Sequence, residues 1–218
     1  MMTTIGRTIG HISMKKIHID LKENQKIFLT SDLHIGHGNI LNFCNRPYES
    51  LKEMHEDIIV KWNSAVGPDD IVIELGDMFW WNSRHEVKKF ISKLNGTIYI
   101  VAGNHDMDIK TLFELCPSEK VTILDDINQF FVSNTGISKV VEFWVSHFPL
   151  ATWSHFEHAP SFFGHIHSGP LSGSQVDIPG QDLILKKNQI DVGADNWNYT
   201  PVELTVLLNL VNYGKKEG

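Results

Sequence analysis

The stretch KIFLTSDLHIGHGN, residues 26–39, joins an apolar segment to a cluster of polar side chains. Its first five residues, Lys26 to Thr30, form the short apolar run that is typical of a buried strand. Asp32 and His34 follow directly. Side chains two residues apart in an extended segment point to the same side, so this carboxylate and this imidazole can face one cavity together. The stretch therefore predicts a strand that ends in a pair of metal-binding side chains.

The same arrangement recurs four times further along the chain, where apolar runs end in clusters of Gly, Asp, Asn and His. These clusters are Gly76-Asp77, Gly103-Asn104-His105-Asp106, Ser146-His147 and Gly164-His165-Ile166-His167. Ligands bind at the carboxyl edge of the strands in open α/β sheets. We therefore expect all five clusters to meet at one such edge.

The segments between these runs alternate in character. The first half reads as strands separated by amphipathic helices, and the second half reads mainly as strands. Helices are expected at Ser50–Val66, Arg84–Leu94, Ile109–Leu115 and Pro201–Asn212; later strands at Val121–Leu124, Gln129–Val132, Val140–Val145 and Ser161–Phe163; a polar loop at Ser168–Gln181; and a hairpin at Asp182–Asp191. This order predicts one layered α/β domain over residues 1–218, with sheets inside and helices outside.

Composition narrows the functional classes. The chain has 218 residues, a net charge of −7, two cysteines and twelve histidines. The acidic balance opposes a dedicated nucleic-acid binder. Two distant cysteines, Cys44 and Cys116, are expected to be free thiols in a reducing compartment. The absence of a long apolar run or a leader-like N-terminus predicts a cytoplasmic protein without a membrane partner.

Seven side chains in the clusters are candidate metal ligands. They are Asp32, His34, Asp77, Asn104, His147, His165 and His167. Mixed imidazole and oxygen ligation favours manganese, iron, zinc, nickel or cobalt over calcium or magnesium. Seven ligands are too many for one tetrahedral zinc, and they suit two ions that share Asp77.

The motifs DLH, GD, GNHD, SH and GHIH, in this order, resemble those of the calcineurin-like metallophosphoesterase superfamily. The stretch from DLHIGHGNI to FCNRP and the later DVGADNW, residues 191–197, are similar to a small bacterial and phage-type branch of it. The resemblance implies a four-layer α-β-β-α sandwich of mixed sheets with helices outside, and a dinuclear centre. It assigns Asp32, His34, Asp77 and His167 to one ion, and Asp77, Asn104, His147 and His165 to the other.

The resemblance also implies the chemistry. A hydroxide that bridges two divalent ions, Mn²⁺ as the first choice, would cleave a phosphomonoester or phosphodiester of a small substrate. His105 would bind the phosphoryl group and protonate the leaving group. The alternative is a nuclease or cyclic-nucleotide phosphodiesterase with the same site, although the net charge disfavours nucleic acid as a substrate. A non-enzymatic scaffold is less favoured, because the set of metal ligands is complete.

One motif departs from the protein Ser/Thr phosphatases of the superfamily, whose GD motif continues as GDxVDRG. Here it reads GDMFWW, with Trp80 in place of the Asp that orients the catalytic histidine. Protein phosphatase activity is therefore disfavoured, and the orienting partner of His105 stays open, with the adjacent Asp106 as one candidate that could equally point away.

Several other residues have two interpretations. His37 either touches the phosphate or is a loop histidine. Arg46 either clamps phosphate or forms a structural salt bridge, and Asn39 is expected to cap a helix rather than contact substrate. Asp195 is expected to bind a ligating histidine. The aromatic residues in the loops either stack on a leaving group or fill the core; they are Phe79, Trp80, Trp81, Trp153 and Trp197. Two histidines, His155 and His158, are expected at the surface.

Overall fold

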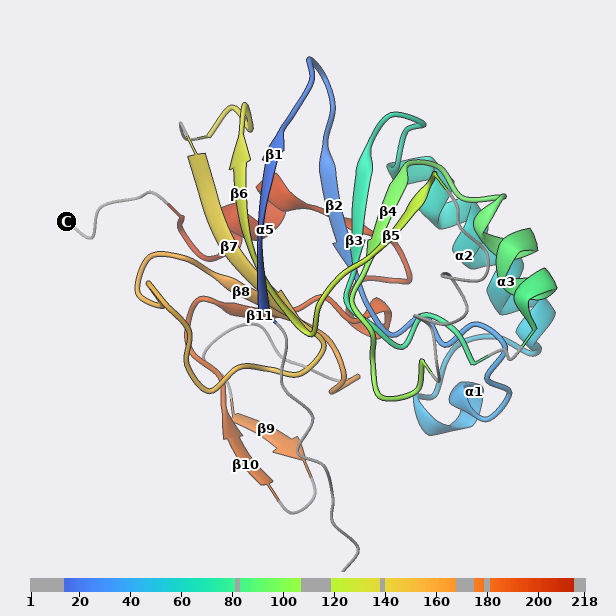
Figure 1. Ribbon diagram of the computed structural model, residues 1–218. Helices are drawn as coiled ribbons and strands as arrows, with labels where there is room; N and C mark the ends of the chain where they lie inside the picture. The colour runs from blue at the N-terminus through green and yellow to red at the C-terminus, as the bar shows by residue number, and fades with distance from the viewer. Residues whose placement is uncertain are drawn as a thin grey trace, which may run out of the picture.

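Two five-stranded sheets pack against each other in the computed structural model, which describes residues 14–80, 83–106, 119–137, 140–167, 175–178 and 181–213. Figure 1 shows the sheets side by side, with helices α1, α2 and α3 to one side of the pair. The first sheet has the order β12 (Val202–Glu203), β2 (Ile27–Thr30), β3 (Ile71–Glu74), β4 (Thr97–Ile100), β5 (Val121–Ile123). Strands β2 to β5 run parallel, and β12 is antiparallel to β2. All residues of β2 and β3 are buried, as is typical of a parallel sheet that is covered on both faces.

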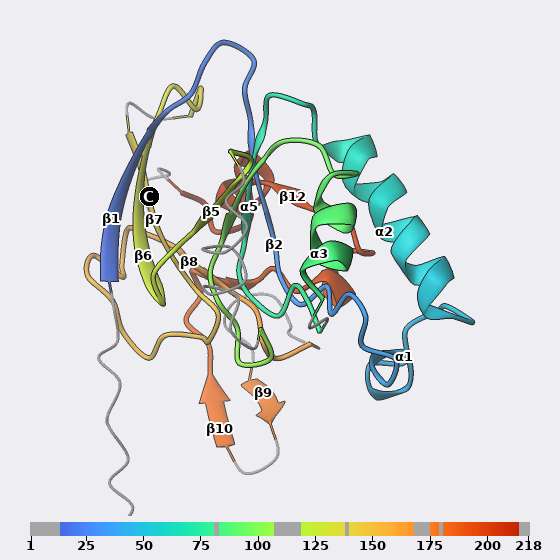
Figure 2. The same cartoon turned by 45° about the vertical axis from the view of Figure 1, so that its right-hand side comes forward.

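Helices α1 (Ile40–Phe43), α2 (Leu51–Ala65) and α3 (Arg84–Ile91) cover the outer face of this sheet (Figure 2). The apolar faces of α2 and α3 pack on strand residues, for example Trp62 and Phe90 in one cluster with Val72. The side chains of Ser50 and Ser83 accept hydrogen bonds from backbone N–H groups three residues further on, so both helices begin at a polar cap. None of the helices in the described part combines the length and the apolar character that crossing a bilayer requires.

The second sheet is mixed. Its order is β1 (Met14–Asp20), β6 (Ile127–Ser133), β7 (Val140–Ser146), β8 (Ser161–Phe163), β11 (Gln189–Asp191). Only β6 and β7 are antiparallel to each other. Val141, Phe143 and Val145 alternate along β7 and point into the core between the sheets. That core also receives three leucines of α5 (Leu204–Leu210).

The layered α/β sandwich with mixed sheets is as predicted, with one difference at its outermost layer. Trp144 on the outer face of the second sheet packs against Trp153 and Ala159 of the segment that follows β7. Within the described ranges this loop segment, and not a helix, covers that face.

One strand was not expected, and three local expectations differ from the structure. Strand β1 was not expected, because its residues are exposed or half-buried at the edge of a sheet and include no continuous apolar run. The C-terminal helix begins at Leu204, because residues 202–203 first pair with β2. The predicted loop at Ser168–Gln181 contains β9 (Gln175–Ile178), which pairs with β10 (Gln181–Ile184). The hairpin expected at Asp182–Asp191 is therefore wrong, since β11 pairs instead with β8. The helix expected at Ile109–Leu115 and the thiol of Cys116 lie outside the described residues, whereas Cys44 is a free thiol.

Candidate metal centre

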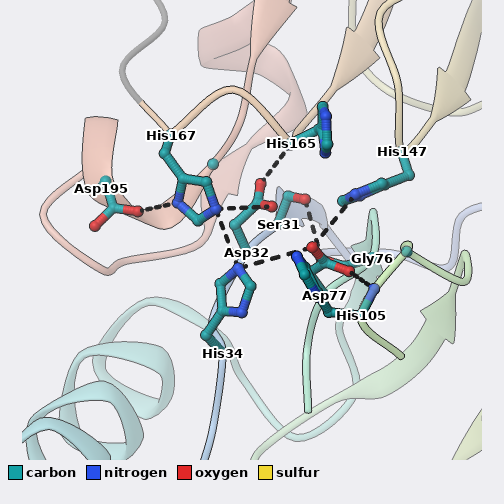
Figure 3. A network of polar contacts seen from close by, with 12 residues as sticks. Ser31, Asp32, His34, Gly76, Asp77, His105, His147, His165, His167 and Asp195 are labelled. Carbon is teal, nitrogen blue, oxygen red and sulfur yellow. Dashed lines mark hydrogen bonds and ion pairs between the residues drawn. The ribbon is translucent and has the colours of Figure 1, made fainter. Parts of the chain in front are cut away.

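The five polar clusters converge at the carboxyl ends of strands from both sheets (Figure 3). The Asp32 and Asp77 loops follow β2 and β3, and the Asn104 loop follows β4. His147 follows β7, and the loop with His165 and His167 follows β8. The predicted meeting of these clusters at one edge is what the structure shows.

The first group of candidate ligands consists of Asp32, His34 and His167, whose ligand atoms lie within 4.8 Å of one another. The Nε2 atoms of His34 and His167 are 3.1 Å apart, and the Nε2 atom of His167 lies 3.7 Å from Asp32 Oδ1. That Oδ1 atom is buried and has no hydrogen-bond partner. A buried carboxylate oxygen without a partner, beside two converging ring nitrogens, fits a cation.

The second group consists of Asp77, His147 and His165, which also lie within 4.8 Å of one another. His147 Nδ1 donates to the Leu75 carbonyl oxygen at 2.8 Å, so the Nε2 atom is the ring nitrogen that faces the centre. This Nε2 atom lies 3.5 Å from Asp77 Oδ2 and 2.9 Å from Asn104 Oδ1. The backbone contact of His147 therefore orients its ring as a metal ligand requires.

Asp77 lies between the two groups. Its Oδ2 atom is 3.7 Å from His34 Nε2 and 3.5 Å from His147 Nε2, while Oδ1 accepts the backbone N–H of His105 at 2.7 Å. The carboxylate is thus fixed on one side by the chain and faces one imidazole of each group on the other. This is the position that a ligand shared by two ions requires.

The protonation states also suit a cation. Burial lowers the pKa of His34 to about 3, so this ring is neutral. Burial alone would lower the pKa of His167, but hydrogen bonds to Asp195 and Cys44 and the charge of Asp32 raise it to about 10. A divalent ion at this position would compete with a proton for the two Nε2 atoms. Burial opposes the ionised form of Asp77, yet the hydrogen bond and charge of His147 keep its pKa below the ordinary value.

The backbone at the centre has an unusual conformation. Five candidate ligands have φ between +51° and +75°, in the left-handed region that non-glycine residues rarely adopt: Asp32, His34, Asp77, His165 and His167. The loops also approach each other closely. A Cβ atom at Gly103 would overlap the backbone nitrogen and Oδ1 of Asp77, and one at Gly164 would overlap Ser31 Oγ and Asp32 Oδ2. Such strain persists only where the surrounding structure enforces it, and it is concentrated at functional sites.

Comparison with known proteins agrees with this geometry. The sequence profile of the calcineurin-like phosphoesterases matches residues 25–197. The chain belongs to the calcineurin-like phosphoesterase family. Membership supports a metal-dependent phosphoesterase that uses divalent ions, and the structure contains two groups of candidate metal-binding residues.

Similar proteins are found in archaea, phages and bacteria. The uncharacterized protein MJ1445 of Methanocaldococcus jannaschii is 30% identical over 196 residues, which is 88% of this chain and 94% of that protein. The Gene 66 protein of Mycobacterium phage L5 is 33% identical over 81 residues, 36% of this chain and 39% of its own. The crystal structure of AQ665 from Aquifex aeolicus, a protein of unknown function, has the same fold: its TM-score is 0.58 at 20% identity, covering 86% of this chain and 100% of that one.

In this family member, Arg46 forms the salt bridge that was one of its two interpretations. Its side chain is 0% exposed, and Nε and Nη2 donate to the two carboxylate oxygens of Asp195 at 2.8 and 2.9 Å. The guanidinium also donates to the carbonyls of Leu33 and Asp32. A clamp on phosphate, the other interpretation, does not fit a guanidinium that is buried and hydrogen-bonded in this way.

Asp195 contacts a candidate ligand, as its interpretation required. Its Oδ2 atom accepts from His167 Nδ1 at 2.9 Å, which turns the Nε2 atom of that ring toward Asp32. Burial would raise the pKa of Asp195, but the hydrogen bonds from His167 and Arg46 lower it, so the carboxylate is ionised. Arg46, Asp195 and His167 thus form a continuous polar chain that ends at the candidate metal centre.

Other expectations have mixed outcomes. Asn39 lies at the N-cap position of α1, but its side chain makes no capping hydrogen bond. Asp106 does not orient the His105 ring through its carboxylate, which accepts backbone N–H groups of Gly103, Asp77 and Phe79 instead. His155 and His158 are exposed, as expected. Of the loop aromatics, Phe79 and Trp153 are buried in the core, and the Trp197 indole N–H donates to a backbone carbonyl. Trp81 lies outside the described residues.

Three features of the site were missed from the sequence. The His37 ring, 9% exposed, lies beneath Trp80, with ring centroids 3.9 Å apart. Phe148 packs on His165 with centroids 4.4 Å apart. The thiol of Cys44 lies beside His167 and Asp195. Each contact joins residues distant in the chain, so local patterns carry no signal for it.

Proposed function

We propose that this protein hydrolyses phosphate esters of small substrates at a centre of two divalent metal ions. The observation that carries the proposal is the position of Asp77, whose Oδ2 atom lies within 3.7 Å of His34 Nε2 and 3.5 Å of His147 Nε2. A carboxylate shared by two groups of ligands is the usual basis of a two-ion site.

The residues would divide between the ions as the family resemblance implies. One ion would be held by Asp32, His34, Asp77 and His167, and the other by Asp77, Asn104, His147 and His165. When bound, the ions would neutralise the phosphoryl oxygens and lower the pKa of a water molecule so that it can attack phosphorus. The mixture of nitrogen and oxygen ligands favours Mn²⁺ as the first ion to test, with iron, nickel, zinc and cobalt as alternatives.

His105 would supply the proton for the leaving group. Its backbone is held by Asp77 Oδ1, its side chain is exposed, and its ring lies 5.7 Å from the His34 ring. An imidazole at the open side of the centre can donate a hydrogen bond to a phosphoryl oxygen and transfer its proton to the departing alkoxide. Trp80 packs against this ring at 5.0 Å and replaces the missing acidic residue as its neighbour.

The substrate would be a small monoester or diester. The net charge of −7 opposes the approach of a long polyanion, so a nuclease is the second candidate and not the first. Hydrolysis of p-nitrophenyl phosphate, of its bis-ester and of single-stranded DNA, each with Mn²⁺-, Ni²⁺- and Zn²⁺-loaded protein, would rank these activities.

The bridging role of Asp77 is tested by Asp77→Ala, with metal content measured by mass spectrometry. We expect two ions in the wild-type protein and loss of both metal and turnover in the variant. Asp69→Ala is the matched control, because that side chain is exposed and belongs to none of the five clusters. An Asp77→Ala protein that retains two ions and full activity would contradict the proposal.

A further inference from the structure

We propose that Trp80, backed by His37, is a stacking platform for a planar aromatic ring carried by the leaving group of the substrate. The inference rests on the proposed phosphoesterase function and assigns it a substrate class. We call Trp80 and His37 together the aromatic platform.

The platform is fixed by the loops that carry the candidate ligands. The Trp80 backbone N–H donates to the Ile35 carbonyl oxygen at 2.9 Å, and Ile35 forms an isolated parallel bridge with Phe79. Trp80 therefore follows the Asp77 loop while it is anchored to the Asp32–His34 loop. The position of the indole is therefore tied to both loops, and these loops carry candidate metal ligands.

The indole stacks on one side and stays exposed elsewhere. The Trp80 and His37 rings are 3.9 Å apart and nearly parallel, at 7°. His37 is 9% exposed and Trp80 is 42% exposed, so Trp80 shields the histidine and still offers much of its own surface to solvent. The same indole lies 5.0 Å from the His105 ring, tilted by 42°. An aromatic group on the leaving alcohol would thus meet Trp80 when the ester oxygen is beside His105.

Exposed aromatic side chains gather at this centre. Ten large hydrophobic side chains are exposed among the described residues, and four of them are aromatic: Phe43, Trp80, Phe148 and Phe156. Phe43 lies 6.1 Å from His37, and Phe148 lies 4.4 Å from His165. Phe148 and Trp80 therefore border the candidate centre, and Phe43 borders the aromatic platform. Apolar surface that stays in water around a polar site indicates a binding surface for an apolar group.

The competing explanation is that Trp80 only packs against His37 and His105. That role would affect every substrate equally, because it acts through groups that touch the phosphoryl end. A stacking role affects only substrates with a ring. Base–aromatic stacking corresponds to about a 5- to 150-fold change in affinity, equivalent to roughly 1–3 kcal/mol. A difference of this size between two substrates with the same ester group separates the two roles.

The experiment compares kcat/KM for AMP and ribose 5-phosphate, which share the scissile ester and differ in the base. A second pair, benzyl phosphate and cyclohexylmethyl phosphate, matches size and tests a small aryl ring. The variants are Trp80→Ala, Trp80→Phe as the conservative replacement, and Phe156→Ala as the control, since that exposed ring lies against Trp153.

We expect Trp80→Ala to lower kcat/KM for AMP about 5- to 150-fold more than for ribose 5-phosphate, mainly through KM. Trp80→Phe should recover most of this difference, and Phe156→Ala should show none. The comparison of benzyl phosphate with cyclohexylmethyl phosphate shows whether a single aryl ring is enough for stacking on Trp80 or whether a nucleobase is needed. Equal losses on AMP and ribose 5-phosphate, with equal losses on the second pair, would overturn the platform and leave the proposed function intact.

If the metal-loaded protein hydrolyses none of these esters, the proposed function fails, and calorimetric binding of AMP and ribose 5-phosphate still decides the platform. Tighter binding of AMP that is lost in Trp80→Ala would support it. Equal affinities in the wild-type protein would overturn it.

Discussion

Replacing Arg46 by methionine should destabilise the protein and weaken its metal binding. The guanidinium donates to both carboxylate oxygens of Asp195 and to the carbonyls of Asp32 and Leu33. Without it, the Asp195 carboxylate stays 8% exposed, loses its two hydrogen bonds from the guanidinium and keeps His167 as a partner. Breaking one partner of a buried ion pair costs about 3–5 kcal/mol, which for a chain of this size lowers the Tm by about 6–20 °C.

The effect on metal follows from the next contact in the chain. Asp195 Oδ2 accepts from His167 Nδ1 at 2.9 Å and so orients the nitrogen that faces the centre. Removing a partner that orients a metal-ligating histidine typically costs about 10–100-fold in metal affinity, and this is the upper limit for Arg46→Met, which leaves Asp195 in place but without its guanidinium. Calorimetric titration of the metal-free Arg46→Met protein with Mn²⁺ measures this loss, and thermal unfolding followed by circular dichroism measures the stability.

The double variant Arg46→Met/Asp195→Leu separates the two effects. It removes the Asp195 carboxylate together with Arg46, so part of the lost stability should return, while metal affinity should be at least as low because His167 then has no acceptor for its Nδ1 proton. Lys52→Met is the control, because that exposed cation, 3.9 Å from Glu56, should change the Tm little. An unchanged Tm in Arg46→Met, or strictly additive losses in the double variant, would refute the reasoning.

Three further results are expected. His105→Ala should retain both ions in metal analysis and lose roughly 10²–10⁴ in kcat, the usual contribution of a positioned general acid, whereas a halved metal content would make it a ligand. Gly103→Ala should lower the unfolding free energy, measured by urea titration, by about 1–3 kcal/mol, because the new methyl group meets backbone that cannot move aside. Gly38→Ala is the control and should be tolerated, because its methyl group would meet no atom closer than 3.9 Å. Burial lowers the pKa of His55 from 6.5 to about 4, and the neutral ring accepts the Gly36 N–H at its Nε2 atom. The contribution of neutral His55 to stability is therefore complete above pH 6.5 and is lost as the pH falls toward 4. Over that range the unfolding free energy of the wild-type protein should fall relative to His55→Gln, and parallel curves would show that this hydrogen bond does not respond to protonation.

The strands of the first sheet and the candidate ligands could be predicted because their signals are local. The strands β2 and β3 are continuous apolar runs, and each ends in a polar motif whose residues share one side. Helix α2 shows its apolar face at regular spacing, with Met54, Ile58 and Trp62 buried. In these segments, burial and residue type coincide, so the pattern indicates the structure.

The remaining features depend on contacts between distant residues. Strand β1 carries two lysines and no clean alternation, and its place is set by pairing with β6, more than a hundred residues away. The ion pair of Arg46 and Asp195 spans 149 positions, so the sequence allowed a phosphate contact equally well. The stack of His37 and Trp80 likewise joins two loops. Which partner a loop side chain chooses is settled by tertiary packing.

The left-handed backbone of the candidate ligands makes the centre dependent on the rest of the molecule. A non-glycine residue in this conformation costs roughly 1–2 kcal/mol, so five of them together store about 5–10 kcal/mol. That is similar to the whole folding free energy of many domains, about 5–15 kcal/mol. The ligand loops cannot hold their own shape, and the two sheets must do so for them. Substitutions deep in the sandwich, far from any ligand, should therefore relax these loops before they unfold the chain.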